Sequence, residues 1–325
     1  MYSSGAATFR ADLAGVVMQT SDWETGLIAG RVLPVVNVDD KDGLYPVFDK
    51  DKAQALKRAT KIRRANGSTY SRGSMAYSQD NYATFEYGHE IPLDYNTVKE
   101  TSRFFSAESV TAMLAKRKIL LDWEIRAAAA TFNTTNYGSA TNSGTAYTIA
   151  NIATFDIGLD VDLAKARIRA KGESDANMSV VLSNDVFIRA RASTKMQNRL
   201  RGIGVSSDTI LGVDETAFAE ALGVKEVLVG KNYYDTAGEN VAFSGSAIWG
   251  NTYVWVGRLA TGNTLESLLS GGAQATLNWS QYGPPIGVFS YEEPQTNSRV
   301  IRAAHHVVEK VINSNQGDLI ASQYS

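Results

Sequence analysis

Hydrophobic residues repeat with helical spacing between Ser106 and Phe132. Val110, Leu114, Leu121, Ile125, Ala128 and Phe132 recur at intervals of three, four or seven. Ser106 is of a type that caps helix N-termini, and Glu108 falls in the first turn. The pattern predicts a helix over 106–132, about 40 Å long at 1.5 Å per residue. Because that exceeds the width of a small domain, we expect a flat, elongated subunit with this helix along its length.

A second pattern joins a short helix to a strand. Asp214 can cap a helix whose apolar residues share one face, and Gly223 stands where a left-handed residue would end it. The apolar residues of that face are Ala217, Phe218, Ala221 and Leu222. The β-branched run Val224–Val229 follows directly and predicts a strand.

The region from Phe155 to about Gly287 alternates helical and strand patterns after a connector, 133–147, rich in Gly, Ser, Thr and Asn. We expect a mixed α/β domain of about 130 residues. Its predicted elements are a helix over 156–171, a buried strand over 178–182, a helix over 184–199 and a strand over 248–256. Two β-rich stretches within 288–311 close the chain, and we expect them to pack on the long helix and leave a short polar tail.

Two N-terminal segments are not expected to fold as domains of their own. Residues 1–36 are too irregular for a domain and too apolar for a free tail, so we expect them to dock on another surface. Residues 37–92 have strand-like ends and a short basic middle compatible with helix. The strand-like ends carry Tyr45, Val47 and Phe48 on one side and Tyr82, Phe85 and Tyr87 on the other. Since long loops and lone hairpins are rarely stable alone, 37–92 is interpreted as an extended arm.

Composition narrows the class of protein. The chain has 325 residues, 44% of them hydrophobic, so it can bury a substantial core. Lys and Arg total 32 against 34 for Asp and Glu, and the net charge of -2 gives no long-range attraction to nucleic acid or to an anionic membrane. Cysteine is absent, which excludes disulfides and thiolate chemistry. No signal peptide or membrane-spanning run is evident, so we expect a soluble protein.

Candidate chemistry is sparse. The histidines are His89, His305 and His306, and the adjacent pair should point to opposite faces of a strand. Gly202–Ser207 (GIGVSS) lacks the third glycine and the preceding strand of a dinucleotide-binding loop, and Asp39–Gly43 (DDKDG) lacks calcium-loop spacing. The adjacent Glu292 and Glu293 are interpreted as turn residues. We therefore predict no catalytic residue, no cofactor site and no metal site.

Three segments together carry a resemblance to a known family. They are EYGHEIPLDYN (86–96), SAESVTAMLAKRKILLDWEIRAAAA (106–130) and ALGVKEVLVGKNYYD (221–235), the last followed by IWG (248–250). In this order they resemble the major capsid proteins of tailed phages, the Hong Kong 97 type, over nearly the whole chain. The resemblance implies an α+β fold with five parts: an N-terminal arm (1–36), an extended loop (37–92), a peripheral domain with its spine helix (93–150, helix 106–132), an axial domain (151–287), and return strands with a C-terminal tail (288–325).

The resemblance also implies a structural role instead of an enzymatic one. Copies would form hexamers and pentamers that tile an icosahedral shell, the head, around a double-stranded DNA genome, and the shell would expand on maturation. The protein would be located in the virion capsid after assembly in the host cytoplasm. Implied partners are a separate scaffolding protein, since the recognisable arm begins near Met1, a portal, a possible decoration protein and DNA contacted non-specifically, with no membrane.

Contact residues between copies follow from the same resemblance. In this family the arm lies over a neighbouring subunit, so the basic cluster of the arm is expected to meet carboxylates there. The expected contact residues are Lys57, Arg58, Lys61, Arg63, Arg64 and Arg72 in the arm, with Phe9 and Trp23 in the N-terminal segment. A charge run is also typical of a solvated face.

Two alternatives stay open. An encapsulin-like compartment shares the fold but encloses a protein cargo. A soluble α/β enzyme built on 155–287 is the alternative of a different class, although the sequence offers it no convergent acid, base or cofactor motif.

Overall fold

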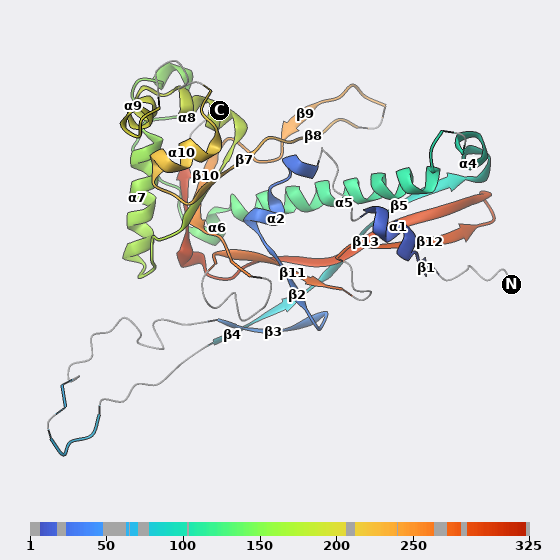
Figure 1. The fold of residues 1–325 in the computed structure, drawn as a ribbon, viewed down its shortest axis with the longest axis horizontal. Helices are drawn as coiled ribbons and strands as arrows, with labels where there is room; N and C mark the ends of the chain where they lie inside the picture. The colour runs from blue at the N-terminus through green and yellow to red at the C-terminus, as the bar shows by residue number, and fades with distance from the viewer. Residues whose placement is uncertain are drawn as a thin grey trace.

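The computed structural model describes residues 7–17, 24–47, 63–64, 66–70, 78–102, 104–205, 212–238, 240–262, 272–280 and 285–322. Its longest helix, α5 (Ala107–Thr131), runs along the length of the molecule (Figure 1). The Ser106 hydroxyl accepts a hydrogen bond from the Ser109 N–H at 3.4 Å, and Phe132 is the C-cap. The helix predicted from periodicity is therefore confirmed with its N-cap.

A mixed sheet packs against α5. Among the described residues it contains six strands, in the order β1-β12-β13-β11-β2, with β5 on the other side of β13. The strands are β1 (Thr8–Phe9), β2 (Val35–Val38), β5 (Phe85–Asp94), β11 (Gln274–Trp279), β12 (Gly287–Glu293) and β13 (Ser298–Val311). Ile301 packs beside Ala112, and Ala303 packs beside Ala115 and Ile119 of α5. The predicted return of the last strands to the long helix is confirmed.

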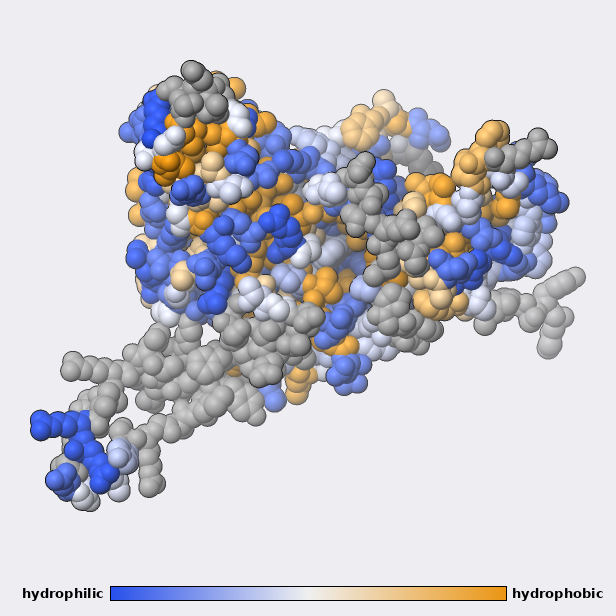
Figure 2. Space-filling view, in the orientation of Figure 1, coloured by the Kyte–Doolittle hydropathy of each residue, from blue (hydrophilic) through white to orange (hydrophobic). Residues whose placement is uncertain are grey.

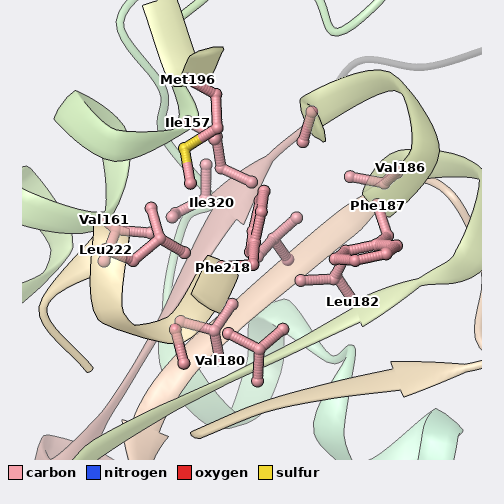
Figure 3. Close-up of a cluster of buried hydrophobic side chains, with 14 of the residues drawn as sticks. Ile157, Val161, Val180, Leu182, Val186, Phe187, Met196, Phe218, Leu222 and Ile320 are labelled. Atoms are coloured by element: carbon pink, nitrogen blue, oxygen red, sulfur yellow. The ribbon is translucent and has the colours of Figure 1, made fainter. Parts of the chain in front are cut away.

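A second sheet forms the other half of the molecule. Its order is β14-β10-β6-β7, with β6 and β7 parallel. The strands are β6 (Met178–Ser183), β7 (Glu226–Gly230), β10 (Tyr253–Arg258) and β14 (Gly317–Ala321). The helices around it are α7 (Ile157–Ala170), α8 (Asn184–Ala192), α9 (Thr194–Gly202) and α10 (Glu215–Leu222). Figure 3 shows their shared core, in which Phe218 lies among residues from β6, α8 and α7.

All six residues of β6 are buried because both faces of this sheet are covered. Val180 and Leu182 face the core under the four helices, whereas Val181 faces a second core that includes Ala127 of α5 and Trp255. A strand covered on both sides is rich in apolar residues on both faces. The predicted buried strand is thus confirmed, and its second face joins this half of the molecule to α5.

The predicted cap geometry of α10 is also confirmed. The Asp214 carboxylate accepts from the Ala217 N–H at 3.0 Å, and Gly223 ends the helix with a left-handed φ of 59°. The strand that follows is β7.

Two boundaries predicted from sequence are wrong. The single helix predicted over 184–199 is two helices, because Ser193 is extended and its hydroxyl caps α9 by accepting from the Met196 N–H at 3.4 Å. The same hydroxyl donates to the Phe155 carbonyl at 3.1 Å, which ties the break to the core. The strand predicted from 248 begins only at Tyr253 and continues to Arg258.

The expected polar tail is also wrong. Residues Gly317–Ala321 form β14, which pairs antiparallel with β10 and places Val254 opposite Ile320. Leu319 and Ile320 are fully buried, on opposite faces of the sheet and in its two different cores. The end of the described chain therefore crosses from the sheet that packs on α5 into the second sheet, where it forms an edge strand.

The arm begins as a two-stranded sheet. β3 (Asp42–Val47) pairs antiparallel with β4 (Ser78–Ala83), on the opposite side of the six-stranded sheet from α5 (Figure 1). Tyr45 and Tyr82 are buried against Val36 and Val38 of β2. The strand-like ends of 37–92 are thus confirmed, whereas the middle expected to be compatible with helix lies mostly outside the described residues.

Short elements complete the fold. They are α1 (Ala11–Val17), η1 (Glu24–Gly26), α2 (Ala29–Val32), α4 (Tyr95–Thr101), α6 (Thr134–Tyr137), η2 (Ile149–Asn151), β8 (Tyr233–Asp235), β9 (Gly245–Ala247) and η4 (Ser314–Gln316). β8 and β9 pair as a hairpin that lies beside α5 (Figure 1). In α1, Leu13 packs beside Ala112, so the described part of the N-terminal segment docks on the long helix.

One buried carboxylate joins three parts of the molecule. Glu124 of α5 is 1% exposed and accepts from the N–H groups of Ile28 at 2.9 Å and Ala29 at 2.8 Å. It also accepts from the indole N–H of Trp249 at 2.6 Å. Burial raises the pKa of Glu124, and these three donors oppose that shift. The carboxylate therefore holds the start of α2 and the second half of the molecule to α5.

We expect Glu124→Ala to lower the free energy of unfolding by about 3 kcal/mol or more, because it leaves three buried donors without an acceptor. Glu124→Gln should cost less, since its amide oxygen still accepts. Urea unfolding of unassembled subunits measures both, with the exposed Glu220→Ala as the control. A loss for Glu124→Ala no greater than that of the control would contradict this role.

Candidate assembly surfaces

The base of the arm combines negative charge with exposed apolar side chains. Asp39, Asp40 and Asp42 are exposed at the turn into β3. Leu44 in β3 is 60% exposed, and Phe85, the first residue of β5, is 59% exposed. We call these five residues the arm-base patch. They stay together because both the N–H and the hydroxyl of Thr84 donate to the Lys41 carbonyl at 2.9 Å.

The carboxylates of this patch affect the pKa of the nearby Tyr82 phenol. Burial raises the pKa of its phenol, and the carboxylates of Asp40, Asp39 and Asp42 raise it further. The phenol hydroxyl donates to the Asp40 carbonyl at 3.2 Å. An anionic phenol would be repelled by the three carboxylates, so their charges add to the upward shift that burial causes.

The structure describes two members of the basic cluster. Arg63 and Arg64 are exposed in the arm, and the Arg64 guanidinium lies 4.7 Å from the centre of the exposed Tyr70 ring. The remaining predicted contact residues of the cluster, together with Trp23, lie outside the described residues: Lys57, Arg58, Lys61 and Arg72. The contact of this cluster with a neighbouring copy stays a prediction.

Phe9 packs within its own chain. β1 pairs with β12 at Thr8 and Phe9, and the Phe9 ring lies edge-to-face on Phe289 with centroids 5.9 Å apart. The ring remains partly exposed, so the predicted contact with a neighbour is still to be tested.

A groove lies between the β8–β9 hairpin and α5, with a volume of about 390 Å³. Its walls include Leu114 (49% exposed) from the helix and Tyr233 (47%) and Phe243 (70%) from the hairpin. Arg117 and Lys118, both exposed on α5, add positive charge to the lining, and Asp235 of β8 adds one carboxylate. We call this the hairpin groove.

Local hydrogen bonds hold the hairpin in shape. The Asp235 carboxylate accepts from the N–H groups of Ala237 at 2.9 Å and Ser244 at 3.0 Å, and these bonds lower its pKa. Gly245 lies so close to Phe243 that a Cβ there would be 2.8 Å from the ring. The groove was not predicted from the sequence, although the Asp235 turn followed by apolar residues up to Phe243 is a signal that could have identified the hairpin.

Figure 2 shows how apolar surface gathers on this side of the molecule. Hydrophobic side chains cluster at the tip of the β8–β9 hairpin and at the turn between α4 and α5. The exposed residues there include Val241 and Phe243 in the hairpin, and Phe104 and Phe105 before α5. Exposed apolar patches of this kind mark interaction sites in soluble proteins.

The adjacent histidines contact different partners. His305 is buried, with its Nε2 atom 3.5 Å from the Arg126 guanidinium of α5. His306 lies edge-to-face on Trp279, with ring centroids 5.0 Å apart. Burial, followed by the charge of Arg126, lowers the pKa of His305 to about 3. Within the described residues, no three His, Asp or Glu side chains gather as metal ligands.

The interpretation of Glu292 and Glu293 as turn residues is wrong. They end strand β12, and the turn falls on 294–297. Glu292 accepts from the Tyr95 hydroxyl and forms an ion pair with Arg299 at 2.8 Å. Glu293 accepts from the Thr296 hydroxyl at 2.6 Å, so each carboxylate has its own surface partner.

Comparison with solved structures finds the same fold in capsids and in a phage-related protein. A phage-related protein from Bordetella bronchiseptica RB50 matches with a TM-score of 0.70 at 17% identity, covering 98% of this chain and 98% of that chain. The capsid of an empty GTA particle matches with a TM-score of 0.53 at 15% identity, covering 93% and 94%. The capsid of cyanophage P-SCSP1u matches with a TM-score of 0.51 at 12% identity, covering 90% and 87%.

No protein-family model and no curated protein matches this sequence. The structural matches establish the fold: the chain has the α+β fold of Hong Kong 97-type capsid proteins, as the resemblance in its sequence implied. Among the described helices, none combines the length and apolar character needed to cross a membrane.

We expect His305→Gln to flatten the dependence of stability on pH between about 6.5 and 4. The folded state keeps His305 neutral, whereas the unfolded chain takes up a proton below about 6.5. Lowering the pH therefore destabilises the wild type, with a slope of at most about 1.4 kcal/mol per pH unit from this group.

Urea unfolding of unassembled subunits at several pH values measures the difference. The carboxyls of Glu124 and Glu309 have raised pKa values and act in the opposite direction, but they are common to both proteins. Equal slopes for the two proteins would refute the assignment to His305.

Proposed function

We propose that this protein is the major capsid protein of a tailed bacteriophage, and that many copies form the icosahedral shell around a double-stranded DNA genome. The observation that carries the proposal is the fold, which is shared over nearly the whole chain with a phage-related protein and with the capsids of a cyanophage and a GTA particle. The exposed surfaces support it, because an arm and a groove lie on opposite sides of one elongated body.

In this proposal, contacts between copies of the chain build and hold the shell. The arm-base patch and the hairpin groove are different surfaces, and a contact between two different surfaces is head-to-tail. Head-to-tail contacts close into rings when the rotation between copies allows it, here the proposed hexamers and pentamers. Each contact is modest, but a subunit held by two neighbours in a ring gains from both at once.

The finer parts of the proposal follow from the fold family. The five parts of the chain, with boundaries at residues 36, 92, 150 and 287, would act as arm, extended loop, peripheral domain, axial domain and return strands. Partners would be a separate scaffolding protein, the portal, a decoration protein and non-specifically contacted DNA. The protein would assemble in the host cytoplasm, reside in the virion capsid and have no enzymatic activity.

Electron microscopy of the purified full-length protein tests the proposal. We expect rings or closed shells when the chain is expressed with the other head genes of its phage, and irregular or incomplete assemblies when it is expressed alone. Uniform shells formed by the chain alone would refute the need for a scaffolding protein but would still support the proposed shell. A stable monomer or small oligomer under both conditions would overturn the proposed function, and a protein cargo in place of DNA would indicate a compartment.

The basic cluster gives a second test. We expect Arg63→Glu combined with Arg64→Glu to give a folded, soluble protein that does not close shells, because the reversed charges would repel carboxylates on the neighbour. The matched control is Lys99→Glu combined with Lys195→Glu, at two exposed lysines on the body. Circular dichroism checks folding and sedimentation measures assembly; normal shells from the arginine variant would refute this role.

A further inference from the structure

The hairpin groove has the chemistry of a docking surface. Its apolar wall is formed by Leu114, Tyr233 and Phe243, each about half exposed or more. Leaving such side chains in water costs about 25 cal/mol per Å² of apolar area. Arg117 and Lys118 lie one turn further along α5, and Asp235 adds one carboxylate to the lining. The lining is therefore net positive, and the groove favours an occupant that carries apolar groups next to negative charge.

The chain itself contains a surface with that chemistry. In the arm-base patch, Leu44 and Phe85 are both more than half exposed, beside the carboxylates of Asp39, Asp40 and Asp42. The three carboxylates outnumber Lys41, the one cation among them, so the turn carries net negative charge. This charge adds to burial in raising the pKa of the Tyr82 phenol. Patch and groove are therefore complementary both in charge and in apolar character.

A subunit cannot fill its own groove with its own patch. The groove is lined by α5 and the β8–β9 hairpin. β3 and β4 lie on the opposite side of the six-stranded sheet from α5 (Figure 1). Tyr45 and Tyr82 fix the patch there, because both are buried against β2. The occupant that meets both conditions is the patch of a second copy.

We propose that the hairpin groove of each subunit receives the arm-base patch of a neighbouring copy. Leu44 and Phe85 pack on Leu114 and Phe243, while the patch carboxylates approach Lys118 and Arg117. Excluding water from the apolar contact strengthens the charge pairs beside it. The inference rests on the proposed function, since it names the two surfaces that meet in the ring.

Charge exchange tests the proposal in the full-length chain. Lys118→Glu places negative charge in the groove, and Asp40→Lys combined with Asp42→Lys places positive charge on the patch. We expect each variant alone to raise the protein concentration needed for half-maximal assembly by at least about tenfold, because like charges across an interface cost more than the lost attraction. Combining all three substitutions in one chain should restore assembly, since opposite charges face each other again.

Mixing adds an independent measurement. A groove variant and a patch variant that each fail alone are expected to co-assemble when mixed in equal amounts. Each interface in an alternating even-numbered ring then joins opposite charges. Lys195→Glu on α9 makes the same charge change outside the groove and should assemble like wild type. Circular dichroism and urea unfolding of each variant confirm that the subunits are folded.

The outcomes separate this inference from the proposed function. Normal assembly of Lys118→Glu, or failure of both the combined variant and the mixture, would overturn the patch-in-groove contact while wild-type shells leave the shell role intact. Restoration of a defective Lys118→Glu only by a variant of another phage head protein would also overturn it, and would assign the groove to that protein. A wild-type chain that stays a monomer or small oligomer even when it is expressed with the other head genes would overturn the proposed function itself.

Discussion

The carboxylate of Glu124 is the constraint on which the arrangement of the molecule depends. It accepts the N–H groups at the start of α2 and the indole N–H of Trp249, and these donors belong to segments 95 and 125 residues away along the chain. A buried carboxylate is stable only when its lone pairs are occupied. The three segments must therefore meet at one point of α5, and this fixes where the N-terminal segment enters and where the second sheet begins.

The second sheet, which Trp249 helps to hold against α5, is itself tightly packed. Its strands are covered on both faces, by four helices on one side and by α5 with its neighbours on the other. Strand β14 closes one edge with Leu319 on one face and Ile320 on the other. The body is consequently well packed. Many of the large exposed apolar residues lie at the arm base, on the β8–β9 hairpin and at the start of α5, and others lie on helix surfaces of the second half, including Leu159 and Leu163 of α7 and Ile188 of α8.

Local signals predicted much of this fold. The helix from Ala107, its Ser106 cap and the Gly223 end of α10 could be predicted because periodicity and capping depend on neighbouring residues. Ser193 breaks a helix that its pattern predicted, since its hydroxyl bonds to a carbonyl 38 residues away. The strand at Gly317–Ala321 was missed for the same kind of reason: its partner lies in β10, and a five-residue run has too little pattern of its own.

The candidate surfaces depend even more strongly on residues that are distant in sequence. Leu114 belongs to the periodic apolar set that predicted α5, but it is exposed and lines a groove whose other wall lies more than one hundred residues away in sequence. Periodicity shows that a residue lies on an apolar face without showing whether its own chain covers that face. With a net charge of only -2, attraction between copies has no long-range component to rely on. In the proposed shell, recognition would then come from local patches, in which a few charged groups lie beside exposed apolar side chains.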